Sequence, residues 1–257
     1  MTLDDPAGLT GALRRIAREA GDLIMRYYEG GATVRIKADS TPVTEADEAA
    51  ERLIVAALET LTPEIPVVAE ESAAAGAAPD VAGRAFWLVD PLDGTKEFIG
   101  RNGEFTVNIA LIEGGRPVLG VVRAPVAQIT HFAHSGAAFV ERDDGAPRPI
   151  HARFPATDGL VAVVSRSHRS PETDRFLADY SVKEERSAGS SLKFGLIAAG
   201  EADIYPRLGR TMEWDTAAGH AVVAAAGASV RTLDGADLVY GKPGFENPYF
   251  VVRGRER

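Results

Sequence analysis

Acidic side chains in this sequence gather where short apolar segments end. The densest group lies in Asp90–Thr95, which reads Asp-Pro-Leu-Asp-Gly-Thr and directly follows the apolar run 86–89. Glu70-Glu71 follows a second apolar run, and Asp47 and Asp215 stand near the starts of two predicted helices. If the fold brings these carboxylates together, their repulsion would raise their pKa values, and a hard divalent cation such as Mg²⁺ would relieve it. The pattern therefore predicts a magnesium site.

The order of residues within Asp90–Thr95 suits a phosphate as well as a metal. The two aspartates supply carboxylates, and the proline between them, with its fixed φ, helps to leave the Leu92 carbonyl available as a further oxygen ligand. Gly94 and Thr95 are expected at a helix start, where backbone N–H groups favour an anion. We therefore expect metal and phosphate sites side by side.

Other interpretations of these acids stay open. An Asp at a helix start, as at Asp47 or Asp215, is most often only a cap, and Glu70-Glu71 alone is typical of a solvated strand end. A glycosidase also uses two carboxylates, but it predicts neither the phosphate-type glycine nor a third acidic group. Haloacid-dehalogenase phosphatases carry Asp-x-Asp-Gly-Thr near the chain start. Here two residues separate the aspartates, which disfavours an aspartyl-phosphate nucleophile.

Hydrophobic periodicity predicts the elements that position these residues. A helix ends at Gly30-Gly31, and a second begins at the capping-box variant Thr44–Asp47 and runs to Leu61. Short apolar strands follow at 66–69 and 86–89, and a hairpin and a further strand pair follow at 105–122 and 129–141.

The polar stretch Arg142–Pro149 predicts a boundary between two lobes, 1–150 and 151–257. In the second lobe we expect a strand at 160–164, helices at 171–180 and 190–199, a strand at 202–206 and a helix opening at Asp215. The charged run Lys183–Arg186 is expected on a solvated face. This alternation predicts layered α/β lobes.

Composition narrows the class of protein. The 257 residues carry a formal net charge of −9, with 37 acidic and 28 basic side chains, which argues against a nucleic-acid polymer as a partner. The absence of cysteine removes disulfides and thiolate chemistry. No apolar run is long enough to span a bilayer, and the first five residues lack the features of a signal peptide, so we expect a cytoplasmic enzyme.

Taken together, several segments resemble the inositol monophosphatase superfamily. The shared segments are Glu70–Ser72, Trp87–Phe98 and Trp214–Gly219. The sequence is most similar to the CysQ-type branch, the 3'(2'),5'-bisphosphate nucleotidases, through Lys96–Phe98, Gly103–Leu111, Ser165–His168 and Gly189–Phe194. The resemblance spans residues 40–227 and implies a sugar-phosphatase-like αβαβα sandwich.

The resemblance implies roles for individual residues. The magnesium ligands would be Glu70, Asp90, the Leu92 carbonyl, Asp93 and Asp215, with two or three ions bound in all. Asp47 matches a residue associated with an additional, weaker metal position. Glu70 and Thr95 would orient the attacking water, and Gly94 and Thr95 would hold the scissile phosphate through backbone donors, so that water attacks in line without a covalent intermediate.

The same resemblance implies a substrate pocket in the second lobe. Residues matching His168, Ser190, Lys193 and Arg207 lie near the nucleoside and its second phosphate in the nucleotidases, and Asp93 and Asp215 would also border the substrate. Two cations and two neutral donors suit a ligand with phosphate and sugar hydroxyls. Arg166 is assigned no contact.

The predicted reaction is Mg²⁺-dependent removal of the 3'-phosphate from adenosine 3',5'-bisphosphate, giving AMP and phosphate. The resemblance extends this to 3'-phosphoadenylyl sulfate and so to sulfate assimilation. The alternatives are an inositol monophosphatase, a fructose-1,6-bisphosphatase, or a nucleotide-binding sensor without activity. The expected partner is a small phosphorylated nucleotide. A monomer or homodimer is expected, and peripheral membrane association is left open.

Overall fold

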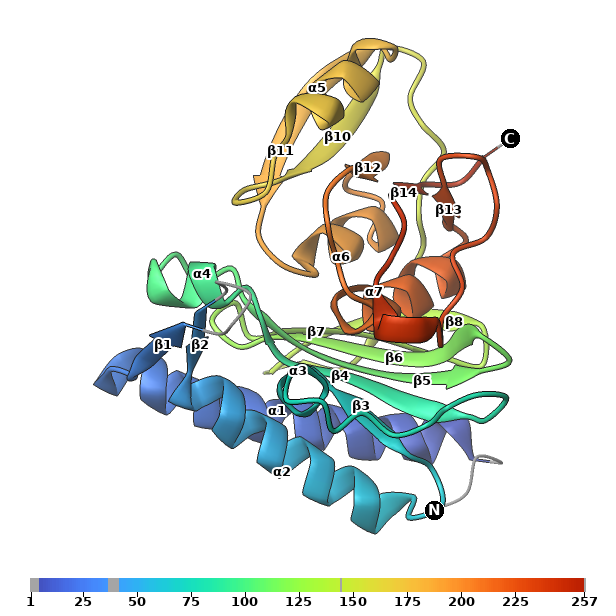
Figure 1. Cartoon of the computed structure of the whole chain (residues 1–257). Helices are drawn as coiled ribbons and strands as arrows, with labels where there is room; N and C mark the ends of the chain where they lie inside the picture. The colour runs from blue at the N-terminus through green and yellow to red at the C-terminus, as the bar shows by residue number, and fades with distance from the viewer. Residues whose placement is uncertain (1–4, 37–41, 144, 257) are drawn as a thin grey trace.

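The protein folds as a stack of helical and β-sheet layers (Figure 1). The computed structural model describes residues 5–36, 42–143 and 145–256. Four of the first five residues, on which the signal-peptide argument depends, lie outside these ranges. Within the part of the chain that the structure describes, no helix has both the length and the apolar character needed to cross a membrane.

The larger sheet, as the described ranges contain it, has seven strands in the order β3-β4-β5-β6-β7-β8-β9. Neighbours are antiparallel except for the parallel pair β3-β4. The strands are β3 (Val67–Ala69), β4 (Phe86–Asp93), β5 (Thr106–Glu113), β6 (Arg116–Ala124), β7 (Ile129–His134), β8 (Ala137–Arg142) and β9 (Arg148–Ile150).

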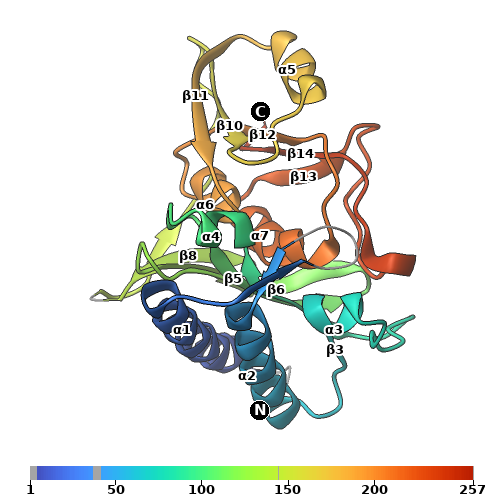
Figure 2. The same ribbon diagram turned by 60° about the vertical axis from the view of Figure 1, so that its left-hand side comes forward.

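Two long amphipathic helices, α1 (Pro6–Gly30) and α2 (Glu45–Leu61), cover one face of this sheet, as Figure 2 shows from the side. Each begins at a side-chain cap: Asp5 accepts from the Gly8 N–H, and Thr44 and Asp47 form a capping box. Because side chains alternate along β4, Trp87 and Val89 join the core beneath α1 and α2. The alternate residues of the strand face the other way, into a second core.

The smaller sheet, within the same described residues, has five strands in the order β11-β10-β12-β14-β13. Two helices, α6 (Leu192–Ala198) and α7 (Glu213–Ala225), lie between the sheets, and α5 (Pro171–Ala178) packs on the outer face. The strands are β10 (Leu160–Ser165), β11 (Val182–Ala188), β12 (Ile204–Arg207), β13 (Ser229–Thr232) and β14 (Phe250–Arg253). The layers therefore run α-β-α-β-α, and the predicted sandwich is confirmed.

Short elements complete the fold near the edges of the layers. A two-stranded ladder joins β1 (Val34–Ile36) to β2 (Pro42–Thr44), and single-turn helices α3 (Glu70–Ala74) and α4 (Thr95–Ile99) follow β3 and β4. A 3₁₀ turn, η1 (Pro243–Phe245), precedes β14. The sheets divide between Ile150 and Leu160, while α7 packs against strands of both.

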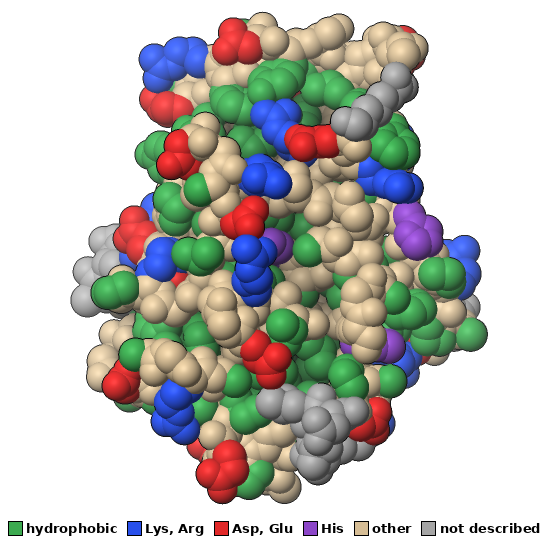
Figure 3. All heavy atoms as spheres, turned by 90° about the vertical axis from the view of Figure 1, so that its right-hand side faces the viewer, with side chains coloured by type: hydrophobic (Ala, Val, Ile, Leu, Met, Phe, Trp, Pro, Cys, Tyr) green, Lys and Arg blue, Asp and Glu red, His purple; other side chains and the backbone are tan. Residues whose placement is uncertain are grey.

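The structure also contains elements that the sequence did not predict. The charged run Lys183–Arg186 lies within β11, an edge strand whose central residues are mostly exposed. Its solvated face was predicted, but the strand was not. On the face of the molecule that Figure 3 shows, acidic and basic side chains are interspersed, with no field of one sign.

Candidate active site

A bulge in β4 brings the two aspartates of the acidic motif to the same face of the sheet. Asp90 pairs with Asn108 and Asp93 with Thr106, so three steps along β4 match two along β5. In a regular strand, residues three apart point to opposite faces, and the extra residue reverses this. The contacts of Asp93 show that its carboxylate lies on the same face as Asn108: Oδ2 accepts from Thr106 Oγ1 at 3.4 Å and from Asn108 Nδ2 at 3.3 Å.

Proline at position 91 explains why the bulge falls there. It has no N–H to give to the ladder, and the next N–H, that of Leu92, turns back to Asp90 Oδ1 at 3.0 Å. The side chain of Leu92 is buried in the core beneath α1 and α2. The motif is therefore anchored on one side of the sheet and presents its carboxylates on the other.

Gly94 and Thr95 follow as the N-cap and first residue of α4. Gly94 has φ +93°, and a Cβ there would lie 3.3 Å from both the Glu104 carbonyl oxygen and Ser190 Cβ, so glycine suits the position. The Thr95 hydroxyl lies 3.1 Å from Asp47 Oδ1 and 3.4 Å from the Leu92 carbonyl oxygen. Donation to Asp47 leaves the hydroxyl oxygen able to accept a proton donor from the cavity.

Asp47 is almost completely buried behind Thr95 and does not line the cavity. Its Oδ2 accepts from the N–H and hydroxyl of Thr44, which makes it a true helix cap. The sequence left open whether Asp47 caps a helix or serves the site. The structure shows a cap that also contacts a residue of the cavity wall.

Asp215 approaches the bulge from the opposite layer. It lies in the first turn of α7, where its Oδ2 accepts from the Met212 N–H at 2.9 Å, so this aspartate is also a helix cap. Its backbone carbonyl accepts from Ser191 Oγ, which in turn receives a hydrogen bond from Asn108 Nδ2. This chain of contacts ties β5, α6 and α7 together around the acids.

A single cavity of about 640 Å³ collects these residues. Of the residues predicted for the site, all except Asp47 line it: Glu70, Asp90, Leu92, Asp93, Gly94, Thr95, His168, Ser190, Lys193, Arg207 and Asp215. Glu70, Asp90 and Asp93 come from the first lobe and Asp215 from α7, whereas the basic residues come from the second lobe and from α4, where Glu97 also lines the cavity. One cavity thus joins both predicted groups.

The carboxylates strongly perturb one another. Burial, followed by the charges of Glu70, Asp93, Asp215 and Asp47, raises the pKa of Asp90 well above its usual range. Burial, then the charges of Asp93 and Glu70, raises the pKa of Asp215 to about 8. Burial also raises the pKa of Asp93, although the nearby Lys193 ammonium opposes the effect. The site therefore stores repulsion that added positive charge would relieve.

This donor set suits a hard divalent cation. Carboxylates and one backbone carbonyl are oxygen ligands, and the sequence contains no cysteine to supply a thiolate. Across the described residues, no group of three or more His, Asp or Glu side chains is arranged so that it could hold a metal ion by itself. Mg²⁺ usually retains several waters and takes further oxygens from a substrate phosphate, so it does not require a closed protein cage.

The opposite wall of the cavity, which we call the basic wall, carries Lys96, His168, Lys193 and Arg207 beside the single carboxylate of Glu97. Lys193 is buried, and its Nζ donates to the carbonyls of Ala188 and Ser190. Burial lowers its pKa to about 8, against the opposing influence of Asp93. Arg207 Nη2 donates to the Arg210 carbonyl at 2.8 Å.

His168 lies at the mouth of this wall. Its Nε2 is 3.2 Å from Nζ of Lys96, which belongs to α4 of the first lobe. Although the ring is partly accessible, burial and the charges of Arg207 and Lys96 lower its pKa to about 4, so it is neutral near pH 7. Cations from both lobes therefore converge here.

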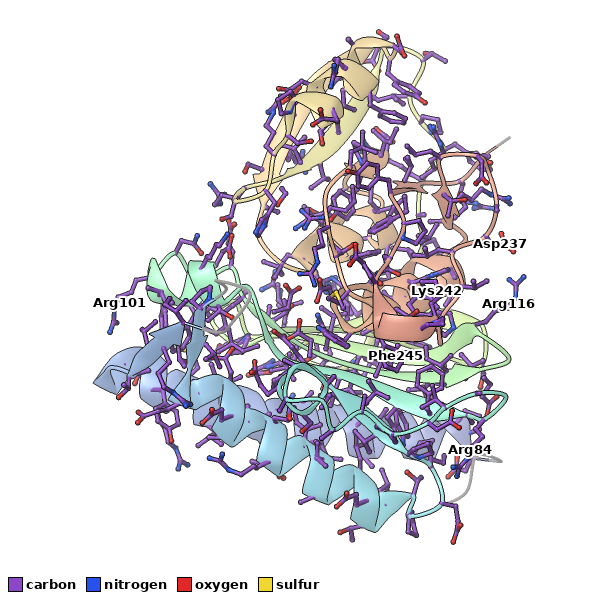
Figure 4. All side chains as sticks on the ribbon, viewed as in Figure 1. Arg84, Arg101, Arg116, Asp237, Lys242 and Phe245 are labelled. Atoms are coloured by element: carbon purple, nitrogen blue, oxygen red, sulfur yellow. The ribbon has the colours of Figure 1, made fainter. Side chains whose placement is uncertain are left out.

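Sequence reasoning missed several residues of the cavity wall. Lys96 was noted only as part of a motif, while Tyr205, Thr211 and Trp214 received no site role. Phe245 also lines the cavity, on the segment between β13 and β14 that runs past α7 (Figure 4). Its position follows from a buried anchor: Glu213 accepts from the N–H groups of Gly241 and Lys242. No local motif near residue 245 indicates this contact.

Comparison with known proteins identifies the family to which this fold belongs. Residues 5–249 match the inositol monophosphatase family. The chain belongs to this family.

Individual relatives narrow the comparison. A protein of Salmonella typhimurium named 3'(2'),5'-bisphosphate nucleotidase CysQ is 50% identical over 241 residues, which are 93% of this chain and 96% of that protein. The crystal structure of CysQ from Bacteroides thetaiotaomicron superposes with a TM-score of 0.81 at 39% identity, covering 97% of this chain and 98% of that one. An inositol monophosphatase of Thermotoga maritima gives 0.77 at 28% identity, covering 93% and 89%.

Proposed function

We propose that this protein is a Mg²⁺-dependent 3'(2'),5'-bisphosphate nucleotidase that hydrolyses adenosine 3',5'-bisphosphate to AMP and phosphate. The observation that carries the proposal is a single cavity with an acidic end and a basic end. A substrate with two phosphates can place the scissile group at the acidic end and the other at the basic end. The names of the relatives at 50% and 39% identity support the same substrate class.

The basic end suits an anion better than a neutral polyol. Arg207 Nε, Ser190 Oγ and Thr211 Oγ1 are buried in the cavity wall, and among the described residues none of the three has a hydrogen-bond partner. Unpaired buried donors are costly, and an anionic ligand that pairs with them recovers that cost. Inositol monophosphate has a single phosphate, so if that phosphate lies among the acids, Arg207 Nε would have no anionic partner.

At the acidic end, we infer that Glu70, Asp90, Asp93, Asp215 and the Leu92 carbonyl hold the metal. Bound divalent cations would neutralise phosphate charge and lower the pKa of water in the site. We propose two or three Mg²⁺ ions.

The protein's own groups would orient the attacking water. Thr95 donates its hydroxyl proton to Asp47, so its oxygen is left to accept from water, and the Glu70 carboxylate is a second acceptor lining the same cavity. The backbone at Gly94 and Thr95 would bind the scissile phosphate. Water held on the far side of that phosphate is positioned for in-line displacement of the ribose oxygen.

Further expectations belong to the same proposal. We extend it to 3'-phosphoadenylyl sulfate, whose 3'-phosphate would occupy the acidic end in the same way, and therefore to sulfate assimilation. We expect the enzyme to act in the cytoplasm as a monomer or homodimer. Gel filtration and fractionation of cells would test this last expectation.

The decisive test is phosphate release from three substrates under identical conditions. Purified protein with Mg²⁺ should hydrolyse adenosine 3',5'-bisphosphate with kcat/KM about 10²-fold or more above inositol 1-phosphate, because the inositol phosphate has no second phosphate for the basic end. Fructose 1,6-bisphosphate has two phosphates, so a lower kcat/KM for this sugar would test the nucleotide preference that the names of the relatives support. Preference for either alternative would reject the proposed substrate. Tight nucleotide binding without phosphate release would instead indicate a sensor.

A further inference from the structure

One carboxylate of the first lobe holds the ends of two strands of the second. Glu104 lies in the loop between α4 and β5. Its carboxylate receives Nε of Arg166 at 2.7 Å and Nη2 at 2.8 Å, and the Gly189 N–H donates to the same group at 2.7 Å. We call the contacts among Glu104, Arg166 and Gly189 the latch.

The topology explains why one side chain can reach both partners. Strands β10 and β11 are parallel neighbours, and their last paired residues are Ser165 and Ala188. Arg166 follows β10 and Gly189 follows β11, so the two residues lie side by side at the carboxyl ends of these strands. Arg166 also donates to the Ser187 carbonyl and, through its N–H, to the Ala188 carbonyl, which holds the two exits together.

The backbones of Glu104 and Gly189 are packed closely against each other in the latch. A Cβ at Gly189 would lie 2.6 Å from the Glu104 carbonyl oxygen and 2.8 Å from Glu104 Cβ, so the two backbones are in direct contact. The same Glu104 carbonyl packs against Gly94, the residue that precedes Thr95. The Glu104 backbone thus lies between Gly94-Thr95 of the first lobe, which we call the phosphate loop, and the turn at Gly189 of the second lobe.

The turn held by the latch carries residues of the basic wall. Ser190 follows Gly189 with φ +42°, an uncommon conformation for serine that its surroundings must maintain. Lys193 Nζ donates to the Ala188 and Ser190 carbonyls, so the lysine is fixed to this turn. Movement of the turn would therefore move Ser190 and Lys193 relative to Thr95.

We propose that Glu104 and Arg166 are positioning residues that set the separation between the phosphate loop and the basic wall, and so determine preference for a substrate with two phosphates. The inference rests on the proposed function for its substrate. An exposed ion pair contributes little to stability in general, and the Arg166 side chain is 43% exposed. The effect of the latch should therefore fall on substrate discrimination instead of folding.

The test compares adenosine 3',5'-bisphosphate with 3'-AMP, which has the scissile phosphate alone. In Glu104→Gln and Arg166→Gln, KM for the bisphosphate should rise about tenfold, while kcat/KM for 3'-AMP stays within about threefold of wild type. Arg166→Lys, which keeps the charge and one donor, should recover part of the loss.

Arg169→Gln is the matched control. Arg169 is 42% exposed and forms two ion pairs, with Asp174 and Glu185, but both partners belong to the second lobe. This variant should retain wild-type values for both substrates. Equal losses on the two substrates in the latch variants, or the same loss in Arg169→Gln, would overturn the latch.

Amide hydrogen exchange separates the latch from the proposed function. Exchange at residues 188–191 should accelerate about tenfold or more in Glu104→Gln and Arg166→Gln but not in Arg169→Gln, whatever the enzyme's substrate. Unchanged exchange there would refute the latch. A wild-type enzyme that does not prefer the bisphosphate over 3'-AMP, with exchange changed as expected, would refute the substrate assignment alone.

Discussion

The chemistry of this site depends on one extra residue in a strand. Asp90 and Asp93 could not face the same cavity from a regular β4, and the bulge at Pro91-Leu92 resolves this conflict. The Asp-x-Asp spacing of aspartyl-phosphate enzymes needs no such bulge, since residues two apart already share a face. With two residues between the aspartates, the strand needs a bulge to place both carboxylates on one face of the sheet.

Asp93→Asn should separate catalysis from folding. Loss of the proposed ligand charge should lower kcat/KM by at least about 10²-fold. The pKa of Asp93 is raised, so its ionised form is disfavoured in the folded state, and the neutral amide should leave the metal-free free energy of unfolding equal or higher. Phosphate release and urea denaturation in EDTA measure the two effects.

The control for this prediction is Asp22→Asn, an exposed position on α1 that should change neither quantity. Near-normal turnover by Asp93→Asn would remove Asp93 from the metal site. A large loss of stability would show that the charge at Asp93 supports the fold.

Residues with a local signature were the predictable ones. The acids of the Asp90–Thr95 motif could be placed because an apolar strand precedes them and a glycine follows. The sequence left open whether Asp47 and Asp215 cap a helix or serve the site, and in the structure one oxygen of each accepts the N–H of the residue three positions before it, as in a capping box. Arg166 was assigned no contact because an isolated loop arginine reveals no partner, and Glu104 lies 62 positions away in the chain.

At the scale of elements, the position of Asp215 depends on how closely α7 approaches the larger sheet. A Cβ at Gly120 of β6 would lie 2.5 Å from the Ala218 carbonyl oxygen and 2.7 Å from Ala221 Cβ. Within the helical layer, a Cβ at Gly219 would lie 2.4 Å from Phe194 Cγ. Small residues on α7 and β6 therefore allow a helix to sit directly on the strand.

Gly120→Ala should push α7 away from the sheet. We expect a loss of about 1–3 kcal/mol in the free energy of unfolding, since the added methyl meets backbone as well as a side chain, together with reduced kcat as Asp215 shifts. Denaturant unfolding and steady-state kinetics measure both. Gly30→Ala is the control, because nothing lies within 4 Å of its Cβ position, and it should be neutral or slightly stabilising. A Gly120→Ala protein with wild-type stability would contradict the close packing.

Helices and strands with a regular hydrophobic repeat were predictable from the sequence, and those that depend on tertiary contacts were not. The amphipathic patterns of α1 and α2 and the hairpin β5-β6 agree with the structure. Strand β11 reads as a polar segment because, at a sheet edge, few of its side chains enter the core. The strand predicted at 202–206 is observed as β12 at Ile204–Arg207, but its antiparallel partner β14 lies far along the chain and was not predicted.

At the scale of the whole molecule, the fold concentrates negative charge between two sheets. The sequence predicted five layers through the resemblance, and its acid pattern predicted where a metal would bind. It could not predict the distances across the cavity, because these depend on how α6 and α7 pack between sheets formed by distant segments. The lobe boundary at residue 150 stays a prediction. Because α7 contacts strands of both sheets, the two halves share a packed interface.

The stored repulsion should make metal-free stability fall as pH rises from about 6.5 to about 8. Asp47, Asp90, Asp93 and Asp215 have raised pKa values when folded. Their contribution is fully present below the unfolded pKa near 4 and is lost as pH rises through the folded values, about 8 for Asp215.

Other groups act outside that window, which is why the range is informative. The lowered pKa values of His131, His168 and His220, each about 4, favour the folded state with rising pH only up to about 6.5. Lys193, lowered to about 8, acts in the same direction only above that pH. Between the two ranges the carboxylates dominate, at about 1.4 kcal/mol per pH unit for each full difference in bound protons.

Thermal unfolding in EDTA at several pH values between 6.5 and 8 should therefore show a falling midpoint. Mg²⁺ should raise the midpoint most at the upper end, because the ligands are then ionised and proton release no longer opposes binding. Asp90→Asn should flatten the pH dependence of the midpoint in EDTA, since it removes the acid whose pKa is raised by the charges of the other carboxylates. A midpoint in EDTA that is constant or rises across this range would mean that the carboxylates are relieved of their repulsion without a metal, and the case for a cation at this site would fail.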